Sequence, residues 1–158
     1  MFESFSFWVY YNYKRKAVKM KNLTNLQQKV IEQLSGESEL NKYNVSILKD
    51  IVNYGADAGF VGFTYYIDTC KFFDDNKELI FKQLLDDRVN IGYNSLAEML
   101  SSFRCFEDVD TYDIEAFLIN SDDESNNEQT TLKNGLAWYA LETVASQLEE
   151  QIEKVLES

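Results

Sequence analysis

The sequence predicts a mainly α protein, a compact helical bundle closed by a long C-terminal helix, with room for one short β element. Its 158 residues contain no proline, the residue that most strongly disrupts helices. Several segments carry apolar residues at helical spacing, and some of them follow a polar pair that is typical of a helix start. The length suits one domain, which we expect over residues 22–158 with an acidic loop at 120–130.

The first helix is expected over residues 23–34. Thr24 and Gln27 stand three residues apart, as in a capping box, and the apolar residues around and after them form one stripe. Gly36 follows the stripe, at the position where a glycine often ends a helix in the left-handed conformation. The segment therefore has both a start signal and a stop signal.

A second helix is expected from Asn44 or Ser46 to Tyr54, because aliphatic residues recur there at helical spacing. Gly55 comes directly after it and is predicted to end it with a left-handed cap. A third helix is expected over 75–87, after a glycine-rich and aromatic-rich stretch. In all these segments the prediction depends on the spacing of the apolar residues.

The third helix has its own start and stop signals. Asp75 and Glu78 form its predicted capping pair, and Gly92 makes the turn that follows it. A shorter helix is then expected to begin after Ser95, with Glu98 as the second member of its capping pair, and to run through residue 103. The segment 111–119 fits either a strand or a short helix, and we favour the helix.

The longest predicted helix lies at the C-terminal end of the chain. Its apolar residues trace one stripe over more than twenty positions. They are Leu132, Leu136, Tyr139, Ala140, Val144, Leu148, Ile152 and Val155. At 1.5 Å per residue such a helix would be roughly 37 Å long, about the diameter of a small domain.

The glycine-rich and aromatic-rich stretch is residues 54–73, YGADAGFVGFTYYIDTCKFF. Glycines let two backbones approach closely, and the aromatic side chains would fill the space around them. Its two acids, Asp57 and Asp68, fit capping positions, Asp57 at a turn and Asp68 at the helix turn 68–71, although the pair would also suit Mg²⁺ or acid–base chemistry. We favour a tightly packed helix–turn–helix corner over a ligand cradle, because both acids would repel phosphate.

The charge is distributed unevenly along the chain, whose net charge is −12. Residues 1–21 hold five basic residues and one acid among many aromatic residues, and we interpret them as a basic and aromatic N-terminal extension. The remaining residues hold ten basic and 26 acidic residues, a net charge of −16. We therefore expect the main body to avoid bare nucleic acid and anionic membranes, and to suit a basic protein surface.

The acids are densest in the middle of the chain, where nine of them occur without any Lys or Arg. They are Glu107, Asp108, Asp110, Asp113, Glu115, Asp122, Asp123, Glu124 and Glu128. The stretch has no glycine, which excludes an EF-hand calcium loop. Two interpretations stay open, a solvated acidic face and a phosphate-like array that occupies a basic groove. For the second, the predicted partner-binding residues are the acids from Glu107 to Glu124 with Phe106 and Tyr112 as aromatic anchors, and Phe117 is a further anchor.

No recognised catalytic motif is present. The sequence has no histidine, no P-loop, no dinucleotide-binding fingerprint and no zinc-ligand spacing. Its two cysteines, Cys70 and Cys105, lack the CxxC spacing and fit buried free thiols in a reducing cytosol. We therefore expect neither an enzyme nor a cofactor or metal site.

Two patterns resemble a known family. YG…GFxGFxYYxDT…FF over 54–73 and LAWYALETVA over 136–145 resemble a family of small acidic proteins from phages and plasmids. The resemblance covers roughly residues 45–85 and 132–150, and Tyr54 stands where that family tends to have histidine. It implies a mobile-element setting, in which small acidic proteins often disarm host defence nucleases.

These observations lead to one main hypothesis. The chain would be a phage- or mobile-element-encoded protein in the cytoplasm of the host bacterium, an anti-CRISPR or antirestriction inhibitor that binds a host defence nuclease. Its acidic face would mimic nucleic acid, and it would bind neither nucleic acid nor membrane directly. One alternative is a small-ligand-binding or magnesium-binding enzyme that uses Asp57 and Asp68. Another is a homo-oligomeric scaffold that pairs through the C-terminal helix.

Overall fold

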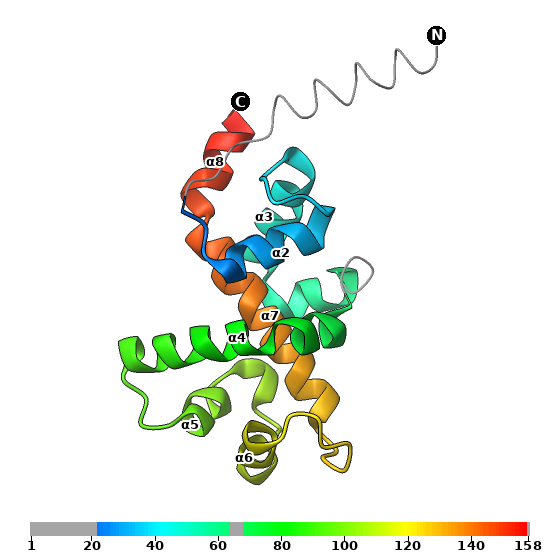
Figure 1. Ribbon diagram of the computed structural model, residues 1–158, viewed down its shortest axis with the longest axis vertical. Helices are drawn as coiled ribbons and strands as arrows, with labels where there is room; N and C mark the ends of the chain where they lie inside the picture. Colours follow the sequence, from blue (N-terminus) through cyan, green and yellow to red (C-terminus); the bar gives the residue numbers. More distant parts are fainter. Residues whose placement is uncertain (1–21, 64–67, 158) are drawn as a thin grey trace. The chain divides into compact units, whose positions relative to one another are not determined.

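The computed structural model describes residues 22–63 and 68–157, apart from the side chains of Ser35 and residues 54–63. Its elements are helical, so the mainly α prediction is confirmed (Figure 1). They are α2 (Asn25–Ser35), α3 (Lys42–Phe63), α4 (Thr69–Ile91), α5 (Leu96–Ser101), the short 3₁₀ helix η1 (Arg104–Phe106), α6 (Thr111–Ile119), α7 (Gln129–Gln147) and α8 (Glu149–Glu157). None of the described helices has the length and apolar character needed to cross a membrane.

Contacts within the chain define two compact units. The first unit comprises residues 1–55 and 141–158, and the second comprises residues 56–140. Helices α3 and α7 each contribute residues to both units. The predicted basic extension, residues 1–21, lies outside the described residues.

The start of α2 is the capping box that the sequence predicts. The Thr24 backbone N–H donates to Gln27 Oε1 at 3.0 Å, and the Gln27 backbone N–H donates to Thr24 Oγ1 at 3.2 Å. Gly36 ends the helix with a φ of 72°, in the left-handed region that favours glycine. Both predicted signals for this helix are therefore confirmed.

Helix α3 is longer than predicted at both ends. It begins at Lys42, where Asn41 and Asn44 exchange hydrogen bonds: Asn41 Oδ1 accepts from the Asn44 backbone N–H at 3.1 Å, and Asn44 Oδ1 accepts from the Asn41 N–H at 2.7 Å. It then continues through Gly55 to Phe63, so the predicted left-handed cap at Gly55 is wrong. A glycine inside a helix costs only about 1 kcal/mol relative to alanine, which the helix bonds beyond it can offset. Residues 54–63 of the predicted helix–turn–helix corner are therefore continuous helix, and residues 64–67 of this stretch lie outside the described residues.

Helix α4 begins at Thr69 rather than at Asp75. Asp68 is its N-cap, because the Asp68 carboxylate accepts from the Lys71 backbone N–H at 3.0 Å, as predicted for the turn 68–71. The predicted start coincides instead with a kink at Asn76, whose φ of −126° and ψ of 16° are not helical. The Asn76 side-chain amide donates to the Phe72 carbonyl at 3.0 Å, the acceptor that a straight helix offers to the backbone N–H of residue 76.

The other predicted signals of the second unit are confirmed. Gly92 ends α4 with a φ of 97°. The Ser95 hydroxyl accepts from the Glu98 backbone N–H at 3.1 Å at the start of α5, which contacts both α4 and α6. The segment 111–119, predicted as a strand or a short helix, is the helix α6. The acidic loop is shorter than predicted, since α7 begins at Gln129 and leaves residues 120–128 between the two helices.

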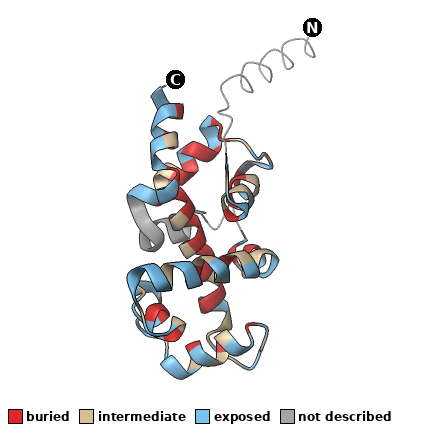
Figure 2. Ribbon diagram, turned by 60° about the vertical axis from the view of Figure 1, so that its left-hand side comes forward, coloured by how far each residue is buried: buried red, intermediate tan, exposed pale blue. Residues whose placement is uncertain are grey.

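The long C-terminal helix is α7 followed by α8, with only Leu148 between them. The hydrogen bonds of a helix continue across this residue, from Leu148 N to the Val144 carbonyl at 3.0 Å and from Ile152 N to the Leu148 carbonyl at 2.8 Å. Figure 2 colours the buried residues of the chain red. Burial on α7 is not limited to the predicted stripe, because Trp138 and Leu141 are buried as well. The buried side of α7 is therefore wider than the predicted stripe.

Aromatic side chains fill much of the second unit. Phe73 of α4 contacts Phe81 and Phe117, with ring centroids 5.9 Å and 5.7 Å apart. Phe103 lies between Phe106 and Tyr139, at centroid distances of 6.0 Å and 5.5 Å. The first set of contacts connects α4 with α6, and the second connects η1 with α7, so the high aromatic content of the sequence serves the interior of this unit.

Candidate functional site

The predicted acidic segment covers the connection after η1, helix α6 and the loop 120–128. The structure divides its acids by exposure and by partner. Five of them are exposed and form no ion pair with another described residue, and one of the five, Asp110, caps a helix. The other four are Glu107, Asp108, Glu115 and Glu124. We call these four residues the acidic surface. Their charges are available to an external partner.

Two large apolar side chains stand exposed on α6 beside these charges. Tyr112 is 75% exposed and Ile119 is 87% exposed. Together with Glu115 they occupy positions i, i+3 and i+7 of one helix, and so lie along one face. Tyr112 therefore has the exposure that its predicted role as an anchor requires, and Ile119 is an exposed residue that the sequence reasoning missed.

The predictions that Phe106 and Phe117 are anchors for a partner are wrong. Phe106 is 1% exposed and Phe117 is 0% exposed. The ring of Phe106 covers Gly135 of α7 so closely that a Cβ atom at residue 135 would lie 2.4 Å from it. Phe117 contacts Phe73 inside the same unit. Both rings take part in the core, because the helical spacing of their neighbours turns them away from solvent.

Three of the predicted partner-binding acids instead shape the chain itself. Asp110 is the N-cap of α6 and accepts from the Tyr112 backbone N–H at 2.8 Å. Asp123 accepts from both the hydroxyl of Ser125, at 2.7 Å, and its backbone N–H, at 3.0 Å. The hydrogen bond from the Ser125 hydroxyl, and to a smaller extent the one from its backbone N–H, lower the pKa of Asp123 below its usual value. The third is Asp122, which forms ion pairs with Lys77 and Lys133. Asp113 is half-buried, and its backbone carbonyl accepts from the Asn126 side-chain amide at 3.0 Å.

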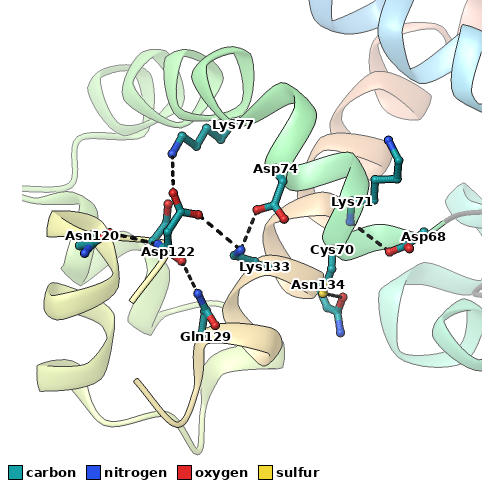
Figure 3. Close-up of polar contacts among 11 residues, drawn as sticks. Asp68, Cys70, Lys71, Asp74, Lys77, Asn120, Asp122, Gln129, Lys133 and Asn134 are labelled. Atoms are coloured by element: carbon teal, nitrogen blue, oxygen red, sulfur yellow. Dashed lines mark hydrogen bonds and ion pairs between the residues drawn. The ribbon is translucent and has the colours of Figure 1, made fainter. Parts of the chain in front are cut away.

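Asp122 belongs to a charged group that connects the loop to two helices (Figure 3). Lys133 Nζ of α7 lies 2.7 Å from Asp74 Oδ1 of α4 and 3.6 Å from Asp122 Oδ1 of the loop. Lys77 of α4 places its Nζ 3.4 Å from Asp122 Oδ2. We call Asp74, Lys77, Asp122 and Lys133 the Lys133 cluster. It brings residues about 60 positions apart in the sequence into one alternating series of charges.

Lys133 is unusual for a lysine, because only 11% of its side chain is exposed. Burial alone would lower the pKa of Lys133, but the hydrogen bond and charge of Asp74, followed by the charge of Asp122, outweigh it and raise the pKa. Lys133 is not among the site residues predicted from the sequence. One signal was available, since Lys133 is the only basic residue between Arg104 and Lys154.

Hydrogen bonds hold the loop at further points. Gln129 Nε2 donates to the Ser121 carbonyl at 2.9 Å, and Asn120 Oδ1 accepts from the Asp122 backbone N–H at 3.2 Å. The backbone N–H of Asn126 donates to the Asp123 carbonyl at 3.1 Å. The loop was predicted to be solvated, and its Asp122 and Glu124 side chains are exposed. Its backbone, however, forms a defined set of hydrogen bonds within the protein.

The structure gives little support to the second predicted site, at Asp57 and Asp68. The Asp68 carboxylate caps α4. The backbone of Asp57 is part of helix α3, and its side chain is not among those that the structure describes. Among the side chains that the structure describes, no group of three or more His, Cys, Asp or Glu residues is placed to hold a metal ion. Nearby, burial and then the charge of Asp68 raise the pKa of the Cys70 thiol, which disfavours the reactive thiolate.

Comparison with known proteins gives a family. A model described as a domain of unknown function, DUF7222, matches residues 20–154. The chain belongs to the DUF7222 family. The DUF7222 match includes the acidic segment and residues of both compact units, and it leaves out nearly all of the basic N-terminal extension. No curated protein and no solved structure matches the chain.

Proposed function

We propose that this DUF7222 protein is a phage- or mobile-element-encoded inhibitor that acts in the cytoplasm of the host bacterium. It would dock its acidic surface on the basic, nucleic-acid-binding surface of a host defence nuclease, such as a CRISPR effector or a restriction enzyme. The observation that carries the proposal is the exposure of Tyr112 and Ile119 beside Glu115 on one face of α6. Charge and apolar area together suit a protein partner better than charge alone does.

The charges and the apolar groups have different parts in this mechanism. Uncompensated acids attract a basic groove over about one Debye length, roughly 10 Å at 0.1 M salt, and raise the rate of encounter. Burial of Tyr112 and Ile119 against the partner then slows dissociation, since exposed aromatic and aliphatic groups gain most from leaving water. The bound protein would occupy the groove that nucleic acid needs.

Two further observations support a partner of basic character. Residues 22–158 have a net charge of −16, which disfavours association with nucleic acid, with anionic lipid and with a second copy of the same body. The apolar stripe of the C-terminal helices is buried within the chain at Leu148, Ile152 and Val155, so it gives no support to a scaffold that pairs through this stripe. The resemblance to phage and plasmid proteins supports the choice of a defence nuclease.

The test is a set of nucleic-acid cleavage assays with purified CRISPR effectors and restriction enzymes from a bacterial host. One variant carries Glu107→Gln, Asp108→Asn, Glu115→Gln and Glu124→Gln. The matched control carries four exposed acids from elsewhere changed to glutamine, Glu78, Glu98, Glu150 and Glu157. We expect the wild type and the control to inhibit an enzyme of this set, and the acidic-surface variant to inhibit it at least about 10-fold less strongly. Equal inhibition by the two variants would contradict the proposal, and so would no inhibition of any enzyme by the wild type.

A further inference from the structure

We infer that Lys133 is a positioning residue for the acidic surface: it ties Asp122 to α7, so that the loop after α6 presents Glu124 to solvent in a fixed conformation. Lys133 is a buried lysine between apolar neighbours. Leu132 and Leu136 on the same helix are fully buried, and the Lys133 side chain is 11% exposed. Burying an ammonium group is costly unless a carboxylate compensates it, and Asp74 does so at 2.7 Å.

Compensation by Asp74 alone would satisfy Lys133 without any contact to the loop. The loop nevertheless places Asp122 on the other side of the ammonium group, at 3.6 Å, and within 3.4 Å of Lys77 (Figure 3). Asp74 and Lys77 stand on either side of the kink at Asn76 in α4, so this short segment offers both an acid and a base. The loop carboxylate thus has two cationic partners from two helices, which fixes its place relative to both.

Such a cluster is better suited to positioning than to overall stability. Replacing a buried ion pair by apolar groups of similar volume is often neutral for stability, because desolvation offsets the attraction. The position of the loop should depend more strongly on the cluster, because the other contacts of the loop are single hydrogen bonds, such as the one from Gln129 to the Ser121 carbonyl. Without Lys133, Asp122 keeps only the more exposed Lys77 among the lysines of the cluster.

Hydrogen exchange of the free protein, followed by mass spectrometry, tests the positioning. Lys133→Met keeps the length and apolar stem of the side chain and removes its charge. We expect backbone amides of residues 120–128 to exchange at least roughly tenfold faster in this variant, with little change in α5 and α8. The backbone amides of Asp123 and Asn126 can show this change, since both donate to carbonyls within the loop and are protected while the loop is ordered. Lys133→Arg, which keeps the charge, should stay close to the wild type.

The control is Lys71→Met, which removes the same charge from the exposed Lys71–Asp75 pair of α4. It should leave the exchange of the loop unchanged. Unchanged loop exchange in Lys133→Met, or equal acceleration throughout the second unit, would overturn the inference. If Lys133→Met does not fold, Asp122→Asn provides the test from the other side. Asp122 is mostly exposed, and its loss should release the same amides.

A binding measurement with a nona-arginine peptide separates positioning from charge, and this step rests on the proposed function. Lys133→Met and Lys71→Met each make the protein one unit more negative, which by itself strengthens attraction to a cationic peptide. A positioning role predicts the opposite for Lys133→Met alone, a several-fold weaker affinity than Lys71→Met. Equal or stronger binding by Lys133→Met would overturn that role. Failure of the proposed function would appear differently, as wild-type affinity that the acidic-surface variant does not lower.

Discussion

Neighbouring residues at the start of α7 contact the rest of the second unit in two different ways. Gly135 lies under the Phe106 ring, in a contact that only the absence of a side chain allows. Lys133 and Asn134 contact polar groups: Asp74 and Asp122 for the lysine, and the Thr69 hydroxyl for Asn134, at 2.6 Å. Successive residues of a helix point about 100° apart, so this short segment serves distinct neighbours.

The difference separates two tasks. Apolar packing against η1 depends on volume, and it should contribute most of the stability that this part of the unit gains. The polar contacts add less free energy, because water is an alternative partner for each group. They are more selective, since a carboxylate or hydroxyl must meet a particular donor or acceptor. We therefore expect substitutions on the apolar side to change stability, and those on the polar side to change mainly local structure.

The largest effect is expected for Phe106→Ala, on the apolar side. Removing a buried aromatic ring leaves a cavity and should lower the free energy of unfolding by about 3–5 kcal/mol. Urea denaturation followed by circular dichroism measures it. Tyr112→Ala is the matched control, because this ring is exposed, and its effect should stay within about 0.5 kcal/mol. Similar losses in both variants would remove the distinction between core and docking residue.

A smaller loss, about 1–3 kcal/mol, is expected for Gly135→Ala, since its new Cβ would lie 2.4 Å from the ring of Phe106. Helix propensity alone would favour alanine by about 1 kcal/mol, so the sign of the change is informative. Combining it with Phe106→Leu should give less destabilisation than the sum of the single changes, as in a double-mutant cycle. Stabilisation by Gly135→Ala alone would show that the contact is not close.

On the polar side, Asn134→Ala should cost about 1 kcal/mol, because the buried Thr69 hydroxyl loses its acceptor. Adding Thr69→Val removes the unsatisfied group and should recover most of the loss. Chemical denaturation of the single and double variants measures both steps. A double variant that is less stable than Asn134→Ala would indicate that Thr69 contributes in another way.

The smallest effect concerns Asp123 in the loop. Ser125→Ala removes the hydroxyl hydrogen bond and should let the pKa of Asp123 rise toward its usual value, as measured by carboxyl NMR against pH. A depressed carboxyl pKa contributes stability above the unfolded pKa, and this stability is lost as pH falls through the folded pKa. Wild type and variant should therefore differ at neutral pH and converge in acid. An unchanged pKa of Asp123 in this variant would show that the hydrogen bond from the Ser125 hydroxyl does not lower it.

Local signals in the sequence predicted the fold well where one element decides the outcome. The capping box at Thr24, the caps at Ser95 and Asp68 and the left-handed glycines at 36 and 92 depend on residues within one turn, and the structure confirms each of them. Gly55 and Asn76 show the limit. A glycine can end a helix or lie inside one, and a capping signature can mark a kink, so both depend on longer-range contacts.

The candidate site was predicted in outline only. Residue type identified a dense run of acids, but it did not separate Asp122, which pairs with Lys133, from Glu124, which is exposed. Nor did it separate the buried ring of Phe106 from the exposed ring of Tyr112. These distinctions depend on which α4 and α7 residues meet the segment, and α4 begins about 40 residues before it. No periodicity within the segment contains that information.

The most direct test of the central claim is an NMR titration of the isotope-labelled protein with the nona-arginine peptide, which maps where a basic partner binds. If the acidic surface and its apolar neighbours bind a basic partner, the largest amide shifts fall on residues 107–124, include Tyr112 and Ile119, and shrink as salt rises. These shifts should be lost in the acidic-surface variant and kept in its matched control. Shifts spread over all acidic parts of the chain, with α8 affected as strongly as α6, would contradict binding at the acidic surface.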